Sequence, residues 1–505
     1  MLASVATFAI VGIDSSEVTV EVDLRRGLPV FAVVGLPDRA VREARERVRA
    51  ALLNSGLDFP LQRLTANLAP ADVRKAGPSF DLALAVAILA ATEQVPPAAV
   101  GEYAVCGELS LSGALRPFNG AVAVAAGARR AGYRRLIVPE ENAGEAALVP
   151  DVEVYGVPSL DRIVGLIRGE WEAAPAAPAA RPPVAGSGPD MADVRGQRDA
   201  KRALEIAAAG GHNVLMVGPP GVGKTMLARR VPGILPPPSF EEAVEITRVQ
   251  SVSGIGDGRL ASRRPFRAPH HTISASGLVG GGAVPRPGEI TLAHRGVLFL
   301  DELAEFSRAA LEALRQPLES GFVEIMRGQR WLRFPADFML VAACNACSCG
   351  RSDGECTCTD VDRSRYRRRL SGPLLDRVDL LCALRPGAGL ELVAKGGDGA
   401  DSSRAIRERV VAARERQRTR LAGTGASSNG AMDAKLTRTH VQLARGIERA
   451  LGLAAASGGL SFRGQDRVLR LAMTIADLDG RDRVVAADLD EALGYRLGAA
   501  EAVAA

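Results

Sequence analysis

The sequence is poor in the features that mark an exported or membrane-bound protein. Aromatic residues make up only 4% of its 505 residues, so Ala, Val, Leu and Ile must build the core. The longest plainly apolar run, Leu82 to Ala91, is too short to span a bilayer. No Lys or Arg precedes Arg25, whereas a secretory signal begins with a positive segment. We therefore expect a cytoplasmic protein with no membrane partner.

Cysteine is also scarce. There are seven, and an odd number without an export signal argues against a disulfide scaffold. The net charge is only +5, which neither requires nor excludes a nucleic-acid partner. Charged residues at 24% and hydrophobic residues at 47% are typical of a globular chain and exclude wholesale disorder. The length predicts about three domains.

Two breaks divide the chain. The stretch 173–190 holds five prolines and few large apolar residues, which indicates an extended linker, with an ordered loop packed on a domain as the alternative. A Gly-rich stretch covers 386–403. We expect an N-terminal domain at 1–172, an α/β domain with a parallel sheet at 191–385, and a helical domain at 386–505.

Periodicity predicts several elements inside these domains. In the N-terminal domain the expected strands are 16–24, 104–111, 136–139 and 152–157, and the expected helices are 38–53 and 80–91. In the last domain the expected helices are 404–421, 436–451, 463–478 and 485–497, with a loop at 423–432.

One segment fits the phosphate-binding pattern G-x-x-x-x-G-K-[ST]. The residues expected to line the nucleotide are Gly218, Pro219, Pro220, Gly221, Val222, Gly223, Lys224 and Thr225. They lie between a short apolar strand and a helix, which is the context that phosphate binding needs. Glycines let main-chain amides turn toward the phosphates, and the helix N-terminus adds partial positive charge. We expect Lys224 to reach the β- and γ-phosphates and Thr225 to hold Mg²⁺.

A second apolar strand, 297–300, ends in two carboxylates. In open α/β sheets ligands bind at this edge. We expect Asp301 to complete the Mg²⁺ shell and Glu302 to activate the attacking water. A third strand, 338–343, ends near Asn345, whose amide could position that water. The alternative for Asn345 is a turn residue.

Together these motifs resemble an AAA+ ATPase. The stretches RPFRAPHHT, GGGAVPRPGEITLAHRGVLFLDELAEF and LRQPLESG resemble the magnesium-chelatase-like branch and, within it, the ComM/YifB family. The resemblance covers nearly the whole chain. It implies ATP and Mg²⁺ as cofactors and a ring, expected to be a hexamer. It also implies single-stranded or branched DNA as partner, because ComM members act as helicases in branch migration during natural transformation.

The resemblance also assigns two arginines. Residues 375–379 are similar to the segment that supplies an arginine finger to a neighbouring subunit, so Arg377 is expected to stabilise charge on the transferred phosphoryl group. The alternative is a surface Arg paired with Asp376 or Asp379. Arg463, at the start of a helix in the last domain, resembles the second sensor arginine. The alternative there is a first-turn Arg that faces water.

Two strand-like segments, 322–326 and 330–334, flank Gly328-Gln329, a pattern typical of a β-hairpin. In helicase relatives a hairpin here projects into the ring pore. The arginines expected to contact DNA are Arg327, Arg330 and Arg333. Guanidinium groups match phosphate oxygens, and Trp331 could stack on a base. The alternative is a solvated basic hairpin with Trp331 in the core.

Five of the seven cysteines cluster within fifteen residues. The candidate ligands of a structural zinc ion are Cys347, Cys349, Cys356 and Cys358. Four thiolates at this span could close one tetrahedral site, and the alternative is a set of reduced thiols in a surface loop. We interpret His270 and His271 as structural or pore-facing.

The N-terminal domain carries a second resemblance. Gly77-Pro78-Ser79 and the stretch 107–120 resemble the peptidase domain of Lon proteases, which uses a Ser–Lys pair. Ser79 falls at the nucleophile position, but Val122 stands at the lysine position. We therefore expect a Lon-like α+β domain without peptidase activity.

The leading interpretation is thus a ring-forming DNA motor. One alternative is a metal-chelatase motor subunit, against which the Lon-like domain and the arginine hairpin argue. The other is a protein-remodelling ATPase. Such motors usually present an aromatic loop between the phosphate loop and the Asp-Glu strand, and residues 277–282 there contain no aromatic side chain.

Overall fold

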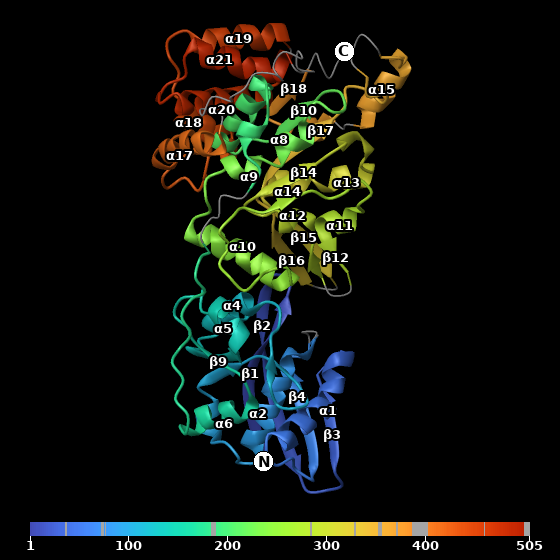
Figure 1. Cartoon of the computed structure of the whole chain (residues 1–505), viewed down its shortest axis with the longest axis vertical. Coiled ribbons are helices and arrows are strands. Elements are labelled where there is room, and N and C mark those ends of the chain that lie inside the picture. The colour runs from blue at the N-terminus through green and yellow to red at the C-terminus, as the bar shows by residue number, and fades with distance from the viewer. Residues whose placement is uncertain are drawn as a thin grey trace.

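The computed structural model describes residues 1–35, 38–71, 75, 77–182, 188–282, 285–327, 330–351, 356–369, 372–385, 402–458 and 460–498. Among the described residues, the two largest sheets follow one another along the long axis of the molecule, with a group of helices beside the second sheet (Figure 1). The N-terminal sheet lies at one end, and the second sheet lies between it and the C-terminal helices.

The N-terminal sheet has seven strands in the order β3-β4-β2-β1-β5-β8-β9. Their bounds are β1 (Leu2–Val11), β2 (Asp14–Arg25), β3 (Val30–Val34), β4 (Arg63–Ala69), β5 (Tyr103–Val105), β8 (Arg135–Pro139) and β9 (Glu153–Val157). β1 and β2 form a long antiparallel hairpin, whereas β1, β5, β8 and β9 are parallel. A short hairpin, β6 (Glu108–Leu109) with β7 (Leu115–Arg116), stands apart.

Helices cover this sheet. They are α1 (Arg39–Asn54), α2 (Asp81–Ala91), α3 (Pro97–Val100), α4 (Ala121–Arg130), α5 (Glu140–Ala146) and α6 (Leu160–Arg168). Asp38 caps α1 by accepting a hydrogen bond from the Val41 amide at 2.9 Å. Every residue of α2 is buried, which explains the apolar run in the sequence, and its Asp81 is held by Arg47 at 2.7 Å. The mixed sheet with these helices agrees with the expected α+β domain.

The strand expected at 104–111 is wrong as a single element. β5 ends at Val105 and β6 begins at Glu108. Between them the Gly107 carbonyl accepts a hydrogen bond from the Leu82 amide at 3.1 Å, and Gly107 packs against Leu82 and Pro139 so closely that a Cβ would stand 3.3 Å from each. The chain therefore leaves the sheet to cover the start of α2.

The second sheet has five parallel strands in the order β11-β14-β17-β10-β18. They are β10 (Val214–Val217), β11 (Phe266–Arg267), β14 (Val297–Leu300), β17 (Met339–Cys344) and β18 (Leu380–Ala383). The surrounding helices are α7 (Arg198–Gly210), α8 (Lys224–Ala228), α9 (Val231–Ile234), α10 (Phe240–Ser253), α11 (Ala275–Val279), α12 (Glu289–Leu292), α13 (Arg308–Ala313), α14 (Arg315–Ser320), α15 (Asp360–Arg369) and α16 (Gly372–Leu375). The expected α/β domain with a parallel sheet is confirmed.

Two small hairpins extend from this domain. They are β12 (Gly280–Gly281) with β13 (Arg286–Pro287), and β15 (Phe322–Arg327) with β16 (Arg330–Pro335). The second one joins α14 to β17, so it lies in the chain directly before the strand that Asn345 follows.

The C-terminal region is helical, as expected. It contains α17 (Ser403–Arg420), α18 (Ala434–His440), α19 (Ile447–Gly458), α20 (Phe462–Leu478) and α21 (Ala486–Leu493). The single helix expected at 436–451 is wrong, because the chain leaves the helix at Val441. There Leu443 forms a β-bridge with Val484, which is fully buried. Burial of this pair outweighs the local helical pattern.

The proline-rich stretch after α6 does not run free of the first sheet. The amides of Ala176 and Ala179 each donate a 2.7 Å hydrogen bond, to the carbonyls of Val154 and Gly144. Small alanine side chains let this extended segment lie close against the domain, and both pack on its core. Residues 183–187, also part of the expected linker, lie outside the described residues.

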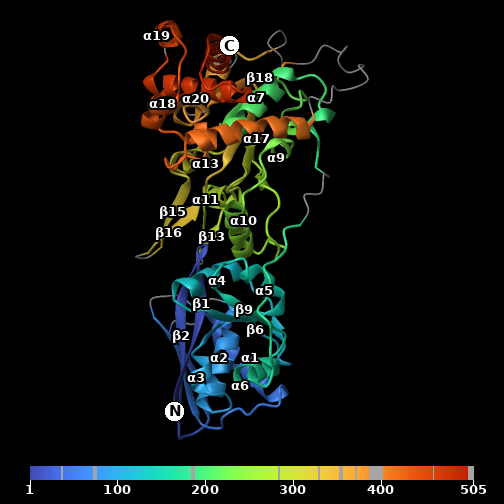
Figure 2. The same ribbon diagram turned by 90° about the vertical axis from the view of Figure 1, so that its left-hand side faces the viewer.

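The two sheets are joined through the turn of the β1–β2 hairpin. Ile13 in this turn is only 3% exposed and belongs to the apolar core of the second domain, together with Val323 and Phe334 of the β15–β16 hairpin. Figure 2 shows β1 and β2 rising from the first sheet toward β13 and β16. Asp14 pairs with Arg248 of α10 at 3.4 Å. The N-terminal domain is therefore anchored at the base of the second hairpin.

Truncating this anchor should destabilise the protein. Ile13→Ala is expected to lower the free energy of unfolding by about 2–5 kcal/mol, because it leaves a cavity between the two domains. Urea denaturation measures this. Leu28→Ala is the control, since Leu28 is 84% exposed and its loss should change the free energy by less than about 0.5 kcal/mol. Equal effects of the two variants would contradict the anchoring role.

Candidate functional site

The phosphate loop follows β10 and leads into α8. Gly221 and Gly223 have φ angles of 76° and 97°, in the left-handed region that favours glycine. A Cβ at Gly218 would stand 2.6 Å from the Leu384 carbonyl oxygen, so a larger residue cannot lie there. The loop thus has the strand–loop–helix geometry that the pattern predicts.

Lys224 points into this loop. Its ammonium donates to the carbonyls of Gly218 and Pro219 at 2.5 and 2.9 Å, and to Oδ1 of Asn345 at 3.1 Å. Burial lowers the pKa of Lys224 below its ordinary value. A phosphate in the loop would give this ammonium an anionic partner in place of neutral oxygens.

Thr225 and Asp301 meet across the edge of the sheet. The Thr225 hydroxyl donates to Oδ2 of Asp301 at 2.6 Å, and Oδ1 of Asp301 accepts from the Glu302 amide at 3.0 Å. One hydroxyl and one carboxylate are hard oxygen donors, which Mg²⁺ prefers together with water and phosphate oxygens. The pair therefore fits the expected Mg²⁺ site.

Glu302 lies beside a histidine that sequence reasoning left out of the site. Oε2 of Glu302 is 3.1 Å from Nδ1 of His271, and the Glu302 side chain is 58% exposed. Glu302 also has a left-handed φ of 52°. His271 follows β11, and because β11 and β14 are parallel neighbours, residues after both strands meet at one edge. Only the strand order could have revealed this contact.

Asn345 is brought to the same edge by β17. Besides its bond to Lys224, its main-chain amide donates to the hydroxyl of Tyr366 in α15, and burial raises the pKa of that tyrosine. Tyr366 is 6% exposed. This buried aromatic side chain was the signal that sequence reasoning missed.

The four predicted cysteines form one cluster two residues beyond Asn345. Their sulfur atoms all lie within 4.8 Å of one another, with Cys347 3.1 Å from Cys349 and 3.5 Å from Cys356. A hydrogen bond from the Arg351 amide lowers the pKa of Cys349 to about 6. In this conformation a Cβ on Gly350 would stand 3.1 Å from Pro220, so the cluster packs against the phosphate loop.

The two resemblance-based arginines lie in different surroundings. Arg377 forms an ion pair with Glu319 of α14. Asp379 accepts a 3.0 Å hydrogen bond from the Asn213 amide at the start of β10. Arg463 is exposed in the first turn of α20, the position of the alternative interpretation.

The β15–β16 hairpin has a buried base and an exposed far end. At the base, Val323 and Phe334 are cross-strand partners with 3% and 0% exposure. Near the far end, Met326 and Trp331 are also partners, with 61% and 67% exposure. The alternative that placed Trp331 in the core is therefore wrong, because the second hairpin strand extends beyond the domain.

The three hairpin arginines are placed unequally. Arg333 lies with its guanidinium carbon 3.5 Å from the centre of the Phe322 ring, a cation–π contact. Arg327 and Arg330 are paired in register beyond Met326 and Trp331, and their side chains, like the turn Gly328-Gln329, lie outside the described residues.

The two residues of the Lon resemblance, Ser79 and Val122, lie in different elements of the N-terminal domain. Ser79 lies in a single turn of 3₁₀ helix before α2, and its carbonyl accepts from the Gly107 amide at 3.0 Å. Val122 is 1% exposed within α4. The ammonium of Lys75 donates to the Pro70 carbonyl. Val122, the residue that we predict at the position of the peptidase lysine, is therefore a core residue.

Comparison with known proteins identifies the family. Family models described as "Magnesium chelatase, subunit ChlI", "Subunit ChlI of Mg-chelatase" and "Magnesium chelatase, subunit ChlI C-terminal" match residues 190–390, 20–142 and 400–496. The chain belongs to the ComM/YifB family of magnesium-chelatase-like AAA+ proteins. This membership implies an ATPase. Within the described part of the chain, no helix combines the length and the apolar character needed to cross a membrane.

Two relatives cover almost the entire chain. The uncharacterized protein YifB of Salmonella typhimurium is 44% identical over 501 residues, which is 98% of this chain and 97% of that protein. The competence protein ComM of Haemophilus influenzae is 42% identical over 503 residues, with the same coverage. Lon protease 2 of Bacillus subtilis is 32% identical over 135 residues, about a quarter of each chain.

Nucleotide binding should depend on the Lys224 ammonium. Lys224→Ala is expected to weaken ATP binding about 10- to 100-fold, because a charged hydrogen-bond donor to phosphate is lost. Titration with a fluorescent ATP analogue measures the Kd. Lys435→Ala, at an exposed position in α18, should leave the Kd unchanged. An unaltered Kd in Lys224→Ala would place the nucleotide elsewhere.

Proposed function

We propose that this ATPase is a DNA motor that moves single-stranded or branched DNA. It acts as a helicase or branch-migration enzyme in recombination and natural transformation. It forms a hexameric ring in the cytoplasm. The observation that carries the proposal is the exposed pair of Met326 and Trp331 on a hairpin that also bears Arg327, Arg330 and Arg333. An exposed indole can stack on a base, and guanidinium groups bind phosphates.

The nucleotide site supplies the driving reaction. Lys224 would bind the β- and γ-phosphates, Thr225 and Asp301 would hold Mg²⁺, and the carboxylate of Glu302 would accept a proton from the attacking water. The metal ion would neutralise charge on the phosphates. Asn345, already bonded to Lys224, would orient that water against the γ-phosphate.

In the proposed ring, two arginines would act at the nucleotide. Arg377 would leave Glu319 and reach the phosphates of a neighbouring subunit, and Arg463 is exposed and free of the core for a similar role. A cation added in this way stabilises the charge that develops on the transferred phosphoryl group. Its arrival from another subunit would make hydrolysis depend on assembly.

A protein-remodelling activity is the second candidate, and one observation favours it. The exposed Trp331 could grip an extended polypeptide as well as a base. Against it, the flanking positions 327, 330 and 333 are all arginine, which suits a phosphate backbone better than a neutral peptide.

DNA should stimulate ATP hydrolysis. Steady-state hydrolysis is compared without DNA and with single-stranded, duplex and four-way-junction DNA. We expect DNA to stimulate hydrolysis by the wild type and Glu302→Gln to show no hydrolysis. In Trp331→Ala the stimulation should be reduced about tenfold or more, because base stacking contributes about 1–3 kcal/mol per base. Trp171→Phe is the control, because Trp171 lies in the N-terminal domain beside Gly165.

The outcomes separate the two candidates. If no DNA alters the rate while an unfolded protein substrate does, the remodelling activity is correct and the DNA motor is wrong. If Trp331→Ala is stimulated as strongly as the wild type, the hairpin is not the contact.

We also propose that the cysteine cluster binds one structural zinc ion. A tetrahedral site with Zn–S bonds of 2.3 Å has sulfur–sulfur distances of about 3.8 Å. The distances from Cys356 to Cys347 and Cys349, 3.5 and 3.6 Å, are close to this value. Thiolates are the ligands that zinc prefers in closed sites, and the amide that lowers the pKa of Cys349 favours its thiolate.

Zinc content tests this assignment. Protein purified under reducing conditions should contain about one zinc per chain by elemental analysis. The Cys349→Ser/Cys356→Ser variant should lose it and bind ATP more weakly, because the loop at Gly350 packs on Pro220. Cys106→Ala removes a thiol in the N-terminal core and should retain the metal. Wild-type protein without zinc would leave the cluster as reduced thiols.

A further inference from the structure

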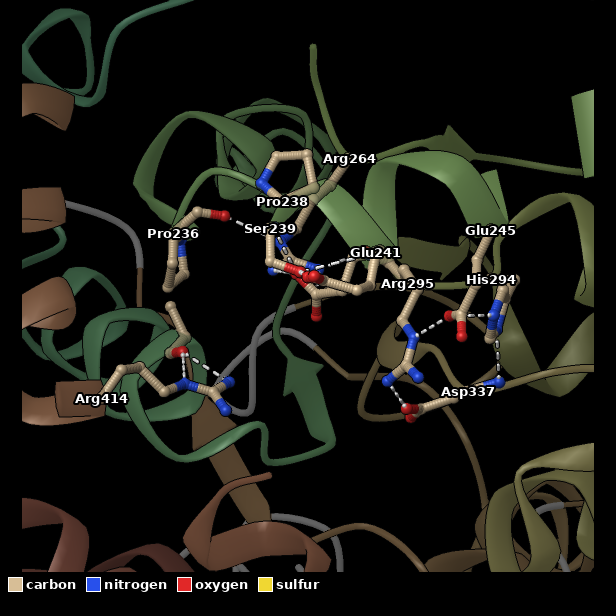
Figure 3. A network of polar contacts seen from close by, with 12 residues as sticks. Pro236, Pro238, Ser239, Glu241, Glu245, Arg264, His294, Arg295, Asp337 and Arg414 are labelled. Carbon is tan, nitrogen blue, oxygen red and sulfur yellow. Dashed lines mark hydrogen bonds and ion pairs between the residues drawn. The ribbon is translucent and has the colours of Figure 1, made fainter. Parts of the chain in front are cut away.

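A second polar cluster lies where the strands of the nucleotide-binding sheet begin, at the ends opposite those that carry the nucleotide site. It joins Glu245 of α10, the pair His294 and Arg295 just before β14, and Asp337 between β16 and β17. Figure 3 shows Glu245, His294, Arg295 and Asp337 turned toward one another, with Arg264 beside them. No role in nucleotide binding or in DNA contact requires residues at this edge, so their concentration there calls for a separate explanation.

The hydrogen bonds within the cluster define its protonation. The Asp337 amide donates to Nδ1 of His294 at 3.1 Å, so that nitrogen carries no proton. Nε2 of His294 therefore donates to Oε2 of Glu245 at 3.2 Å. This hydrogen bond, with a second one from Arg295, lowers the pKa of Glu245 to about 2. The ionised Glu245 carboxylate therefore accepts hydrogen bonds from two different side chains, His294 and Arg295.

Arg295 is held in a conformation that it would not adopt alone. Its φ of 59° is in the left-handed region, which a non-glycine residue keeps only when its surroundings impose it. Its Nε donates to Glu245 at 2.7 Å and its Nη1 to Asp337 at 2.5 Å. Its main-chain amide donates to the Asp337 carbonyl at 2.6 Å, and its own carbonyl accepts from Arg264 at 2.8 Å.

The position of the cluster links two sites. β14 and β17 are parallel neighbours, with Val297 opposite Met339, and the cluster holds the starts of both strands. Their far ends carry Asp301 and Asn345 of the nucleotide site. The β15–β16 hairpin ends at Pro335, two residues before Asp337. A shift of β14 against β17 would therefore reach the hairpin base through these contacts.

We propose that Glu245 is a positioning residue that couples the nucleotide site to the β15–β16 hairpin by fastening the hairpin base to the starts of β14 and β17. Nucleotide binding at one edge of the sheet changes the hairpin at the other through this carboxylate. The proposal rests on the proposed function for its purpose, because the hairpin is the part that would move DNA. Its physical content, a nucleotide-dependent change at the hairpin, does not require DNA.

The sequence provides a reporter for the test. Its two tryptophans are Trp171 and Trp331, so Trp171→Phe leaves Trp331 of the hairpin as the single tryptophan. In this background, Trp331 emission is recorded while a non-hydrolysable ATP analogue and Mg²⁺ are added, and the Kd is measured in parallel. The background protein should show a nucleotide-dependent change in emission.

Glu245→Gln keeps the shape of the side chain and removes its charge. It should reduce the Trp331 response at least about threefold while the Kd for nucleotide stays within about twofold. Glu241→Gln is the matched control on the same helix, since the Glu241 carboxylate accepts from the Ser239 hydroxyl and lies outside the cluster. It should respond as fully as the background protein.

Asp337→Asn tests the same link from the hairpin side and replaces Glu245→Gln if that variant fails to fold. The double variant should lose no more response than the stronger single variant, because both changes break one connection. A full response in Glu245→Gln and Asp337→Asn would overturn the proposal. So would an unresponsive background protein, or a loss of response that follows a parallel loss of nucleotide affinity.

The failure of this proposal differs from the failure of the proposed function. If DNA never stimulates hydrolysis but Trp331 still responds to nucleotide through Glu245, the coupling stands and the DNA motor is wrong. If DNA stimulates hydrolysis in the wild type while Trp331 responds fully to nucleotide in Glu245→Gln and in Asp337→Asn, the motor stands and the coupling is wrong.

Discussion

The parallel pairing of β10, β14 and β17 is the constraint on which the rest of the structure depends. Because the three strands run in one direction, Lys224, Asp301 and Asn345 all emerge at one edge of the sheet. There the Thr225 hydroxyl bonds to Asp301 and the Lys224 ammonium to Asn345. These bonded pairs are 76 and 121 residues apart in the chain, and the backbone ladder sets their spacing before any ligand binds.

The same parallel pairing links the nucleotide site to the starts of β14 and β17. A rigid strand transmits a displacement from one end to the other, and β14 and β17 are short, buried strands. The hairpin is attached at the starts of these strands and the nucleotide site at their ends. Helix α10 lies beside the starts, and it also receives the N-terminal domain through Asp14 and through the Gly120 amide, which donates to the Ser251 hydroxyl. One helix therefore contacts three parts of the molecule.

The N-terminal domain acquires a structural role from this arrangement. Its core keeps the Lon-like fold, and Val122, which we predict at the position of the peptidase lysine, is buried in it. Its longest hairpin instead inserts Ile13 beneath Phe334 and Val323. A fold that elsewhere supports hydrolysis here supports the base of the β15–β16 hairpin, which illustrates that function belongs to sites and not to folds.

Local patterns in the sequence determined a good part of this protein. The phosphate loop, the carboxylates after an apolar strand and the two hairpin strands could be predicted, because each depends on residues near one another in the chain. The cysteine cluster was equally visible from its spacing. The wrong elements, the strand at 104–111 and the helix at 436–451, fail where Gly107 and Leu443 make contacts with distant segments. Periodicity reports local burial and cannot report those partners.

Only the tertiary structure decided which distant groups meet. His271 reaches Glu302 because β11 is the neighbour of β14, and Arg377 meets Glu319 because Asp379 anchors its segment at β10. Ile13 enters the core of another domain. Glu245 bonds to Arg295, 50 positions further along the chain, and Arg295 bonds in turn to Asp337. Strand order and domain packing result from the burial of the whole chain, so no single segment of the sequence encodes them.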